Sequence, residues 1–531
     1  MEISLKINKG FKWFSTETIF LKGYFYDQKN NFYEKENALN YLSKIKNKED
    51  FLNLLDVING VFSVIINIKN TYLIASDCSR AFPLFYSLKN KKIYLSDDIT
   101  YLKNTLNIQR FNPLSEIEIK ASNHTHGKKT LLESIFQVQS NEFIIIENNT
   151  TIQNNFYESY AIKEENSAPY IKLKKEVFIT FESSFKRMIN SLNNKMVVIP
   201  LSGGFDSRLI AVLLKKYNYK NVVCYTYGNL NSLEIKVSKK VAKQLGFKWF
   251  FIEYNSELTG NIHKDKIFKE FAHFAGKFCS TPNLQEYFAV KHLKENNLIH
   301  KESIFIPGYA GDLLGGSQFL KIIPKNLKTE EIIDLIIENK FYNYKITIKE
   351  KELLKNEIEN NLKNSDINYH HKLPSSVFEN YDIAEKIAKY IFNSISFYNF
   401  FGYEHRVPFW DRELLNLFKK IPVKFKLNKV LFNEVLIEEY FKKFDVYFNQ
   451  ELQPTSNKIA IQKIKNKVKP FFPIFIKQKV LRKNDWNNYE PITNQLLLEM
   501  KQNGLKVHRK FNDYNEIIAQ WYIYLCQNKL K

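Results

Sequence analysis

The sequence of 531 residues contains only four cysteines, Cys78, Cys224, Cys279 and Cys526, and no Cys-x-x-Cys pair. Cysteines this far apart suggest neither a disulfide framework nor a zinc site, so we expect reduced thiols and a cytoplasmic protein. The N-terminal segment MEISLKINKGFKW lacks the apolar core of a signal peptide. No stretch approaches the roughly 18 apolar residues that a membrane-spanning helix needs, so no integral membrane segment is expected.

The apolar run FFPIFI at 471–476 is the nearest approach to a membrane segment. It is short, is flanked by lysines and contains Pro473. A place in a core or an interface therefore suits it better than a bilayer.

The chain also lacks an arginine-rich stripe and zinc-finger spacing, although its formal net charge is +22. The excess is mostly lysine spread along the whole length, which is typical of a general compositional bias, so we expect no nucleic-acid partner. A hydrophobic content of 44% with 15% aromatic residues fits a folded protein. Its length is enough for two or three domains.

The first 162 residues predict an α+β domain with antiparallel sheets. Short runs rich in aromatic and β-branched residues, bounded by Asn, Asp, Gly and Lys, predict strands at 19–27, 60–67, 72–77, 92–97 and 142–148. Apolar residues at helical spacing predict a helical stretch over about 36–56.

A second domain is predicted over residues 163–531. The polar segment 161–173 is the best linker, and a helix over about 171–193 follows it. Strands at 196–201, 221–226 and 249–253 then alternate with helices at 206–217 and 232–246, which indicates βαβ units and a parallel sheet. From about 284 onward the pattern is mostly helical, with one more strand-like run at 304–308.

The strand–turn–helix at 197–214, VVIPLSGGFDSRLIAVLL, carries the first candidate site. Gly203 and Gly204 let the backbone approach a ligand, and N–H groups at a helix start point at an anion. It is not a Walker loop, because no Gly-Lys-Ser/Thr follows. An ordinary βα turn is the alternative. Asp206 at the helix entrance is either an N-cap or, beside a bound phosphate, a Mg²⁺ ligand.

Several stretches in order resemble the asparagine synthetase branch of the PP-loop ATP pyrophosphatases. SGGFDS resembles the pyrophosphatase loop, and YTYGNLNSLEIKVSKKVAKQLG at 225–246 resembles the adenine-contacting strand and its helix. IPGYAGDLLGG at 306–316 resembles SGEGxDExxGG, and EHRVPFWD at 404–411 resembles ExRxPFLD. KLNKVLFNEVL at 426–436 resembles the segment whose lysine closes over ATP.

The resemblance implies ATP as a substrate and Mg²⁺ as a cofactor. It assigns ATP binding to Leu201, Ser202, Gly203, Gly204, Asp206, Ser207, Tyr227, Gly228, Gly308 and Tyr309. It assigns Mg²⁺ to Asp206 and Asp312, and catalytic roles to Lys429, Asp206, Tyr309 and Glu404. A structural ion pair between Glu404 and Arg406 is the alternative for that glutamate.

Two positions depart from the family pattern. Tyr309 stands where the family has the glutamate implicated in acid/base work on the nitrogen nucleophile, and Leu313 replaces a second acid. The general base could instead come from Glu270, Glu286 or Glu404. Arg208, in the first turn of the helix, opposes the helix dipole and should reach either bound phosphate or solvent.

The first domain resembles the class II glutamine amidotransferases over 58–99, INGVFSVIINIKNTYLIASDCSRAFPLFYSLKNKKIYLSDDI. In that family a cysteine directly after the initiator Met is the nucleophile, whereas Glu2 stands here. Lys22 stands where the resemblance places the oxyanion-hole Asn. We therefore expect a domain, 1–162, without glutaminase activity.

Together these features predict an ATP-dependent amide ligase that adenylates a carboxylate, couples it to ammonia or an amine and releases AMP. The acceptor is a small molecule, a sugar acid or a peptide. Alternatives are an intramolecular cyclase similar to β-lactam synthetases and lasso-peptide cyclases, an inactive scaffold, and a true glutamine-hydrolysing asparagine synthase. Class II relatives often dimerise, which makes a homodimer one expectation.

Overall fold

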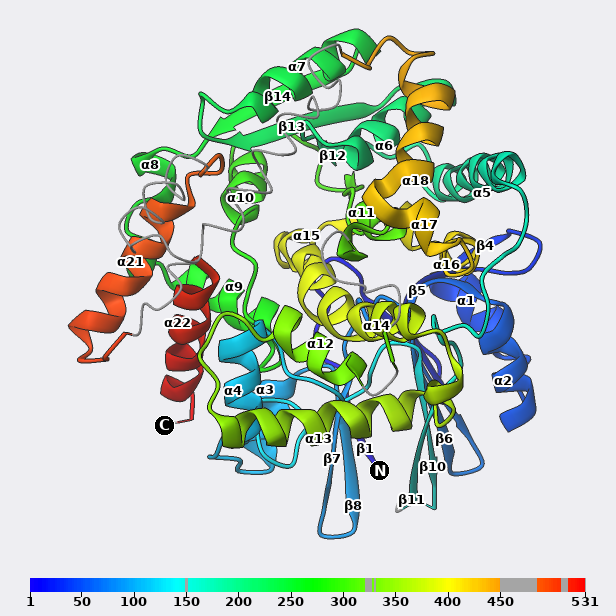
Figure 1. Ribbon diagram of the computed structural model, residues 1–531. Coiled ribbons are helices and arrows are strands. Elements are labelled where there is room, and N and C mark those ends of the chain that lie inside the picture. The colour runs from blue at the N-terminus through cyan, green and yellow to red at the C-terminus, as the bar shows by residue number, and fades with distance from the viewer. Residues whose placement is uncertain (149–150, 320–326, 329–330, 449–484, 508–513, 531) are drawn as a thin grey trace.

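Three β-sheets organise the chain (Figure 1). The computed structural model describes residues 1–148, 151–319, 327–328, 331–448, 485–507 and 514–530. The run at 471–476 lies outside the described residues. The predicted fold class is confirmed: antiparallel sheets in the first part are followed by a parallel sheet and a helical C-terminal part.

The N-terminal part contains two sheets, with strand orders β1-β8-β7-β9 and β11-β10-β6-β5-β3-β2, and β4 pairs with β3. All pairs are antiparallel except β1 with β8. The strands are β1 (Glu2–Ser4), β2 (Trp13–Ser15), β3 (Ile19–Tyr26), β4 (Phe32–Glu34), β5 (Asn59–Ile68), β6 (Thr71–Ser76), β7 (Phe85–Lys89), β8 (Lys92–Ser96), β9 (Phe136–Gln137), β10 (Glu142–Glu147) and β11 (Thr151–Phe156). The helices are α1 (Lys35–Leu42), α2 (Lys48–Val57), α3 (Ile99–Thr105) and α4 (Pro113–Ser122).

The helical stretch predicted over 36–56 is present, and it consists of two separate helices, α1 and α2. Asn47 has extended backbone angles, and its side chain accepts a 2.9 Å hydrogen bond from the backbone N–H of Asp50. An Asn that caps a new helix ends the preceding one, although the apolar spacing continues through both.

The second part opens with α5 (Tyr170–Asn190) and forms a five-stranded parallel sheet with the order β14-β13-β12-β15-β16. Its strands are β12 (Val197–Pro200), β13 (Val222–Gly228), β14 (Lys248–Glu253), β15 (Ile304–Phe305) and β16 (Glu404–His405). Helices α6 (Phe205–Lys216) and α7 (Leu233–Leu245) connect the first three strands. Val197, Val198 and Ile199 are fully buried, as expected of a parallel strand covered on both faces.

The rest of the described chain is mostly helical. Its α-helices are α8 (Ser256–Thr259), α9 (Lys266–Gly276), α10 (Tyr287–Glu295), α11 (Gly311–Leu314), α12 (Glu331–Lys340), α13 (Ile348–Ser365), α14 (Pro374–Asp382), α15 (Ser396–Phe401), α16 (Arg412–Phe418), α17 (Val423–Lys426), α18 (Val430–Leu436), α21 (Tyr489–Gln502) and α22 (Tyr514–Asn528). Two π-helical segments, η4 (Ile383–Ile391) and η8 (Ile437–Phe441), extend α14 and α18. The 3-10 segments are η1 (Ile262–Lys264), η2 (Ser317–Phe319), η3 (Tyr369–His371), η5 (Phe392–Ile395), η6 (Pro408–Trp410) and η7 (Leu427–Lys429). In the described part of the chain, every helix is too short or too polar to cross a bilayer.

The segment between β11 and α5, where the linker was predicted, packs along the helical part. The backbone N–H of Asn166 donates to the carbonyl of Lys420 at 2.7 Å, and Leu373 donates to Ile162 at 2.8 Å. The two parts are also joined by the guanidinium of Arg412, which pairs with Glu158 at 2.8 Å. In Figure 1 the parallel sheet lies at the top and the hairpin β7–β8 at the bottom.

Candidate active site

The turn after β12 is pre-formed by its own hydroxyls. The backbone N–H of Ser202 donates to the Oγ of Ser207 at 3.0 Å, and the N–H of Gly204 donates to the Oγ of Ser202 at 3.1 Å. These bonds fold residues 202–207 into a tight loop at the start of α6. The loop lies at the carboxyl edge of the parallel sheet, where open α/β sheets bind ligands.

Asp206 and Asp312 face each other across this loop. The backbone N–H of Asp312 donates to the Asp206 carboxylate at 2.8 Å. Burial and the charge of Asp312 raise the pKa of Asp206 to about 7, although Lys429 works in the opposite direction. Two carboxylates with little compensation are the oxygen donor set that Mg²⁺ prefers, so these residues fit a divalent cation.

The close approach of Asp312 depends on two glycines. A Cβ atom on Gly308 would lie 2.9 Å from the backbone N of Ser207, and one on Gly311 would lie 2.5 Å from the Asp206 carboxyl carbon. A side chain at either position would therefore push the β15 loop away from α6.

Lys429 reaches the same place from the start of α18. It has a positive φ of 57°, and its aliphatic stem passes over Gly315, where an added Cβ would lie 3.1 Å from the Cγ and Cδ of Lys429. Gly315 therefore makes room for the lysine stem, while Gly316 allows the backbone of Lys426 to lie close. This packing brings together three motifs that are distant in the sequence: the SGG turn, the loop with Asp312 and the segment with Lys429.

These residues surround a cavity of about 610 Å³. Among the predicted site residues, Leu201, Ser202, Gly203, Gly204, Asp206, Ser207, Tyr227, Gly308, Tyr309, Asp312 and Lys429 line it. The lining also contains Pro200, Phe205, Tyr225, Thr226, Glu234, Glu286, Asn433 and Trp486, most of which the sequence patterns did not single out. Lys429 is the one lysine or arginine in this lining, as far as the described residues go.

Gly228 does not line the cavity but shapes its wall. Its φ is +122°, and an added Cβ would lie 2.5 Å from the backbone carbonyl of Trp486. The neighbouring ring of Tyr227 stacks on Tyr254 with centroids 5.1 Å apart. The glycine therefore allows a distant segment to lie against the end of β13.

Glu286 is the common acceptor in a buried hydrogen-bond network beside the cavity. Its carboxylate accepts hydrogen bonds from the hydroxyls of Tyr309 at 2.9 Å and Tyr398 at 2.8 Å, and also from Tyr225. Burial raises the pKa of Glu286, and burial beside this carboxylate raises the pKa of Tyr309 well above its ordinary value. Of the three glutamates weighed as a base, Glu286 is the one at the cavity; Glu270 is exposed on α9.

Glu404 does not line this cavity, so the structure does not support its catalytic assignment. It opens β16, opposite Ile304 at the start of β15, and thus lies at the amino ends of the strands. Its carboxylate is 3.5 Å from the guanidinium of buried Arg406. The structure shows the alternative, a structural ion pair.

Arg208 does not reach solvent, so that expectation is wrong, and it is not among the described residues that line the cavity; contact with a bound phosphate stays a prediction. Its side chain is fully buried. The guanidinium donates to the carbonyl of Gly203 at 2.6 Å and to that of Val446 at 2.9 Å. It also lies 5.2 Å from the ring centroid of Phe205 and 5.3 Å from that of Phe441. These contacts of the buried guanidinium outweigh its unfavourable interaction with the helix dipole. They also connect the loop to the end of the π-helical segment η8.

The N-terminal part holds a lysine where the amidotransferase resemblance places an oxyanion-hole Asn. Lys22 is 4% exposed, donates to the carbonyl of Ile7 at 2.5 Å and lies 3.9 Å from Asp97. Asp97 in turn accepts the indole N–H of Trp13 at 2.7 Å. Burial lowers the pKa of Lys22 to about 8. Glu2, at the position of the family's nucleophile, forms a separate ion pair with Lys92 at 2.7 Å.

Among the described residues, no cysteine has the lowered thiol pKa that would let it replace the missing N-terminal nucleophile. Cys78 is the first cysteine of the sequence, and burial beside Asp77 raises its pKa to about 12. The pKa values of Cys224, Cys279 and Cys526 are also raised by burial. A cysteine nucleophile needs the opposite shift.

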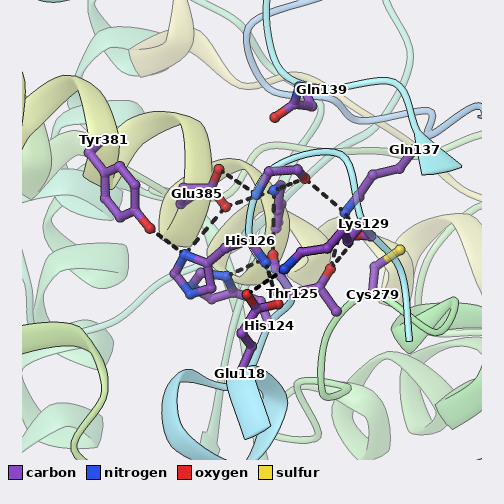
Figure 2. Close-up of polar contacts among 12 residues, drawn as sticks. Glu118, His124, Thr125, His126, Lys129, Gln137, Gln139, Cys279, Tyr381 and Glu385 are labelled. Carbon is purple, nitrogen blue, oxygen red and sulfur yellow. Dashed lines mark hydrogen bonds and ion pairs between the residues drawn. The ribbon is translucent and has the colours of Figure 1, made fainter. Parts of the chain in front are cut away.

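A second polar cluster, His124, His126 and Glu385, brings three ligand atoms within 4.8 Å of one another (Figure 2). The ring nitrogens of His126 are already bonded to the hydroxyls of Tyr381 at 2.6 Å and Ser122 at 2.9 Å.

The carboxylate of Glu385 is engaged as well. It binds the ammonium of Lys389 at 2.7 Å and the N–H of Gly127 at 3.0 Å. Since the Lys389 ammonium would repel a metal cation, we interpret the cluster as a structural one. Its hydrogen bonds connect the loop after α4 to the α14–η4 helix.

The comparisons with known proteins agree with this geometry. Residues 190–438 match the family model described as asparagine synthase. This stretch is thus asparagine synthetase-like, and it contains residues 202–207, Asp312 and Lys429.

Two curated relatives are similar. The microcin J25-processing protein McjC of Escherichia coli is 24% identical over 224 residues, which are 41% of each chain. A putative glutamine-hydrolysing asparagine synthetase of Methanocaldococcus jannaschii is 23% identical over 379 residues, 70% of this chain and 57% of the relative. This chain therefore spans about half the length of the curated relatives that it matches.

Among solved structures, an NH3-dependent NAD synthetase from Campylobacter jejuni is 17% identical, with a TM-score of 0.19. The alignment covers 37% of this chain and 96% of that one.

Proposed function

We propose that this protein is an ATP-dependent amide-forming ligase. It adenylates a substrate carboxylate, releases pyrophosphate, and couples the acyl group to an amine or ammonia with release of AMP. The observation that carries the proposal is the convergence of the SGG loop, the Asp206–Asp312 pair and Lys429 on one cavity of about 610 Å³. The two carboxylates would hold Mg²⁺, which when bound neutralises phosphate charge.

In this proposal the loop amides and Lys429 bind the triphosphate. The substrate carboxylate attacks the α-phosphorus, and the bond to pyrophosphate breaks. Negative charge then grows on the phosphate oxygens and on pyrophosphate, so backbone N–H groups and the Lys429 ammonium stabilise the transition state. One of these amides, that of Gly203, donates to the Glu234 carboxylate, and phosphate would replace this internal anion.

The second half-reaction needs a proton acceptor, because the attacking nitrogen must lose a proton. Tyr309 and Glu286 supply one. The amine proton passes to the Tyr309 oxygen as the Tyr309 hydroxyl proton passes to Glu286, 2.9 Å away. Since burial raises the pKa of Glu286, it is a stronger base than an exposed glutamate.

The nitrogen donor is free ammonia or an amine of the substrate. The buried contacts of Lys22 with Asp97 and the Ile7 carbonyl, together with the raised pKa of the Cys78 thiol, support a first domain without glutaminase activity. One relative is named as a putative glutamine-hydrolysing asparagine synthetase. The features of the first domain disfavour that activity for this chain. The other relative is named as a microcin J25-processing protein, and an intramolecular cyclase stays the second candidate.

Product analysis tests the proposal. The purified full chain is incubated with ATP, Mg²⁺ and cell extract, with and without ammonium, and products are identified by mass spectrometry. AMP, pyrophosphate and a new amide are expected, and Asp206→Asn should form none of them. ADP with phosphate would contradict the mechanism. If wild type shows no thermal shift with ATP and Mg²⁺, the scaffold alternative is favoured.

A further inference from the structure

The cavity wall includes a tryptophan from outside the family-matched stretch. Trp486 lies just before α21 and lines the cavity. Its residue is 40% exposed, whereas Trp410 and Trp521 are 4% and 0% exposed. Its ring centroid is 6.0 Å from that of Tyr227, with the two planes 36° apart. A large, flat, apolar group thus remains open toward the cavity.

Backbone contacts hold this tryptophan in place. The N–H of Asn229 donates to the carbonyl of Trp486 at 2.7 Å, and the side-chain amide of Asn488 donates to the carbonyl of Tyr254. Asp485 accepts the N–H groups of Tyr489 at 2.7 Å and Glu490 at 2.8 Å, which begins α21. Because these bonds fix the segment, the indole is positioned without being buried.

The sheet order gives the cavity two chemically different sides. β12 lies between β13 and β15, so the SGG loop has the end of β13 on one side and the Asp312 loop on the other. The rings of Tyr227 and Trp486 lie on the β13 side, which also holds Glu234, and the carboxylates of Asp206 and Asp312 lie toward the β15 side, which also holds Tyr309. A ligand with a flat ring at one end and phosphates at the other matches this division.

We propose that Trp486, together with Tyr227, forms the face on which the purine of ATP stacks, and that Trp486 is therefore a binding and specificity-determining residue. This inference rests on the proposed function, since it takes the ligand to be ATP. Stacking on an aromatic side chain favours the larger ring system of a purine over a pyrimidine.

Binding measurements on the full chain test the inference. Affinities for ATP and CTP with Mg²⁺, and for inorganic tripolyphosphate with Mg²⁺, are measured by calorimetry for wild type, Trp486→Ala, Trp486→Phe and the control Tyr342→Ala. Tyr342 is 47% exposed and does not line the cavity. Quenching of tryptophan fluorescence by ATP, lost in Trp486→Phe, gives a second readout.

We expect Trp486→Ala to weaken ATP binding by about tenfold to a hundredfold, with tripolyphosphate affinity within twofold of wild type. Trp486→Phe should recover most of the ATP affinity, and the preference for ATP over CTP should shrink in Trp486→Ala. ATP affinity unchanged in Trp486→Ala would overturn the inference and leave the proposed function standing. Equal losses for ATP and tripolyphosphate would also overturn it. Wild type that binds no ATP would overturn both.

Discussion

The backbone N–H of Asp312 donates a 2.8 Å hydrogen bond to the carboxylate of Asp206, although both side chains are acidic. The bond joins the start of α6 to the loop after β15, and it brings two negative charges together at one edge of the parallel sheet. Such an arrangement costs stability unless a cation binds there.

Asp206→Asn should therefore stabilise the ligand-free protein while abolishing binding of ATP with Mg²⁺. The pKa of Asp206 is about 7 in the fold against 3.8 in the unfolded chain, so the folded state loses stability as pH rises from about 4 to 7. At pH 8 we expect the variant to be more stable by about 2 kcal/mol, with a smaller difference at pH 5. Thermal melts across this range measure it, with exposed Asp56→Asn as control. Equal stability at both pH values would contradict the expectation.

Lys429→Met should lower kcat by about 10²- to 10³-fold and change ATP affinity much less. The reason is that its ammonium acts mainly on charge that grows in the transition state. Initial rates of AMP release measure the effect, and Lys424→Met, an exposed lysine of α17, serves as control. A rise in KM for ATP at constant kcat would show that Lys429 only binds the substrate.

Tyr309→Phe and Glu286→Gln should separate the two half-reactions. Because neither residue is assigned to adenylation, exchange of labelled pyrophosphate into ATP should persist. Amide formation should fall by about 10²-fold or more in both variants, and the double variant should be no worse than either single one. Loss of pyrophosphate exchange in Tyr309→Phe would contradict the assignment of Tyr309 to the nitrogen step.

Arg208→Met should destabilise the protein by about 2–4 kcal/mol, because the carbonyls of Gly203 and Val446 would lose their buried donor. ATP affinity should fall as well, since the loop carbonyl of Gly203 would be free to rotate. Denaturant unfolding measures the first effect and calorimetry the second. Lys215→Met, exposed in the last turn of the same helix, should change neither.

Acid should destabilise the fold at the cluster of His124, His126 and Glu385. Burial lowers the pKa of His124 to about 3 and that of His126 well below 6.5. The unfolded chain then binds more protons at these histidines, so their contribution to stability is constant above about pH 7 and falls below 6.5, by up to about 1.4 kcal/mol per pH unit for each histidine. His126→Gln should flatten the pH profile of the melting temperature, whereas exposed His300→Gln should not.

Much of the fold was predictable because the signals are local. Five strands of the N-terminal part were placed within about two residues of β3, β5, β6, β8 and β10. Buried runs such as Val197–Ile199, followed by glycine turns, likewise predicted the β12–α6 unit. The short strands β1, β9 and β16 were missed, because two or three residues show no periodicity and pair only after distant segments meet.

The candidate site divides in the same way. The motifs around Ser202, Asp312 and Lys429 could be read from the sequence, since loop chemistry depends on the order of neighbouring residues. Arg208 was misjudged from its place in the helix dipole, because only the tertiary fold brings Val446 and Phe441 to its guanidinium.

By itself, the sequence determined the order of elements, the parallel sheet and the glycine turn before α6, since each follows from contacts a few residues apart. The tertiary structure decided that Glu286 rather than Glu404 meets Tyr309, and that Trp486 reaches Tyr227. Those contacts join residues separated by 23 and 259 positions, and the physical reason is that the packing of helices on a sheet, not the local sequence, sets such distances.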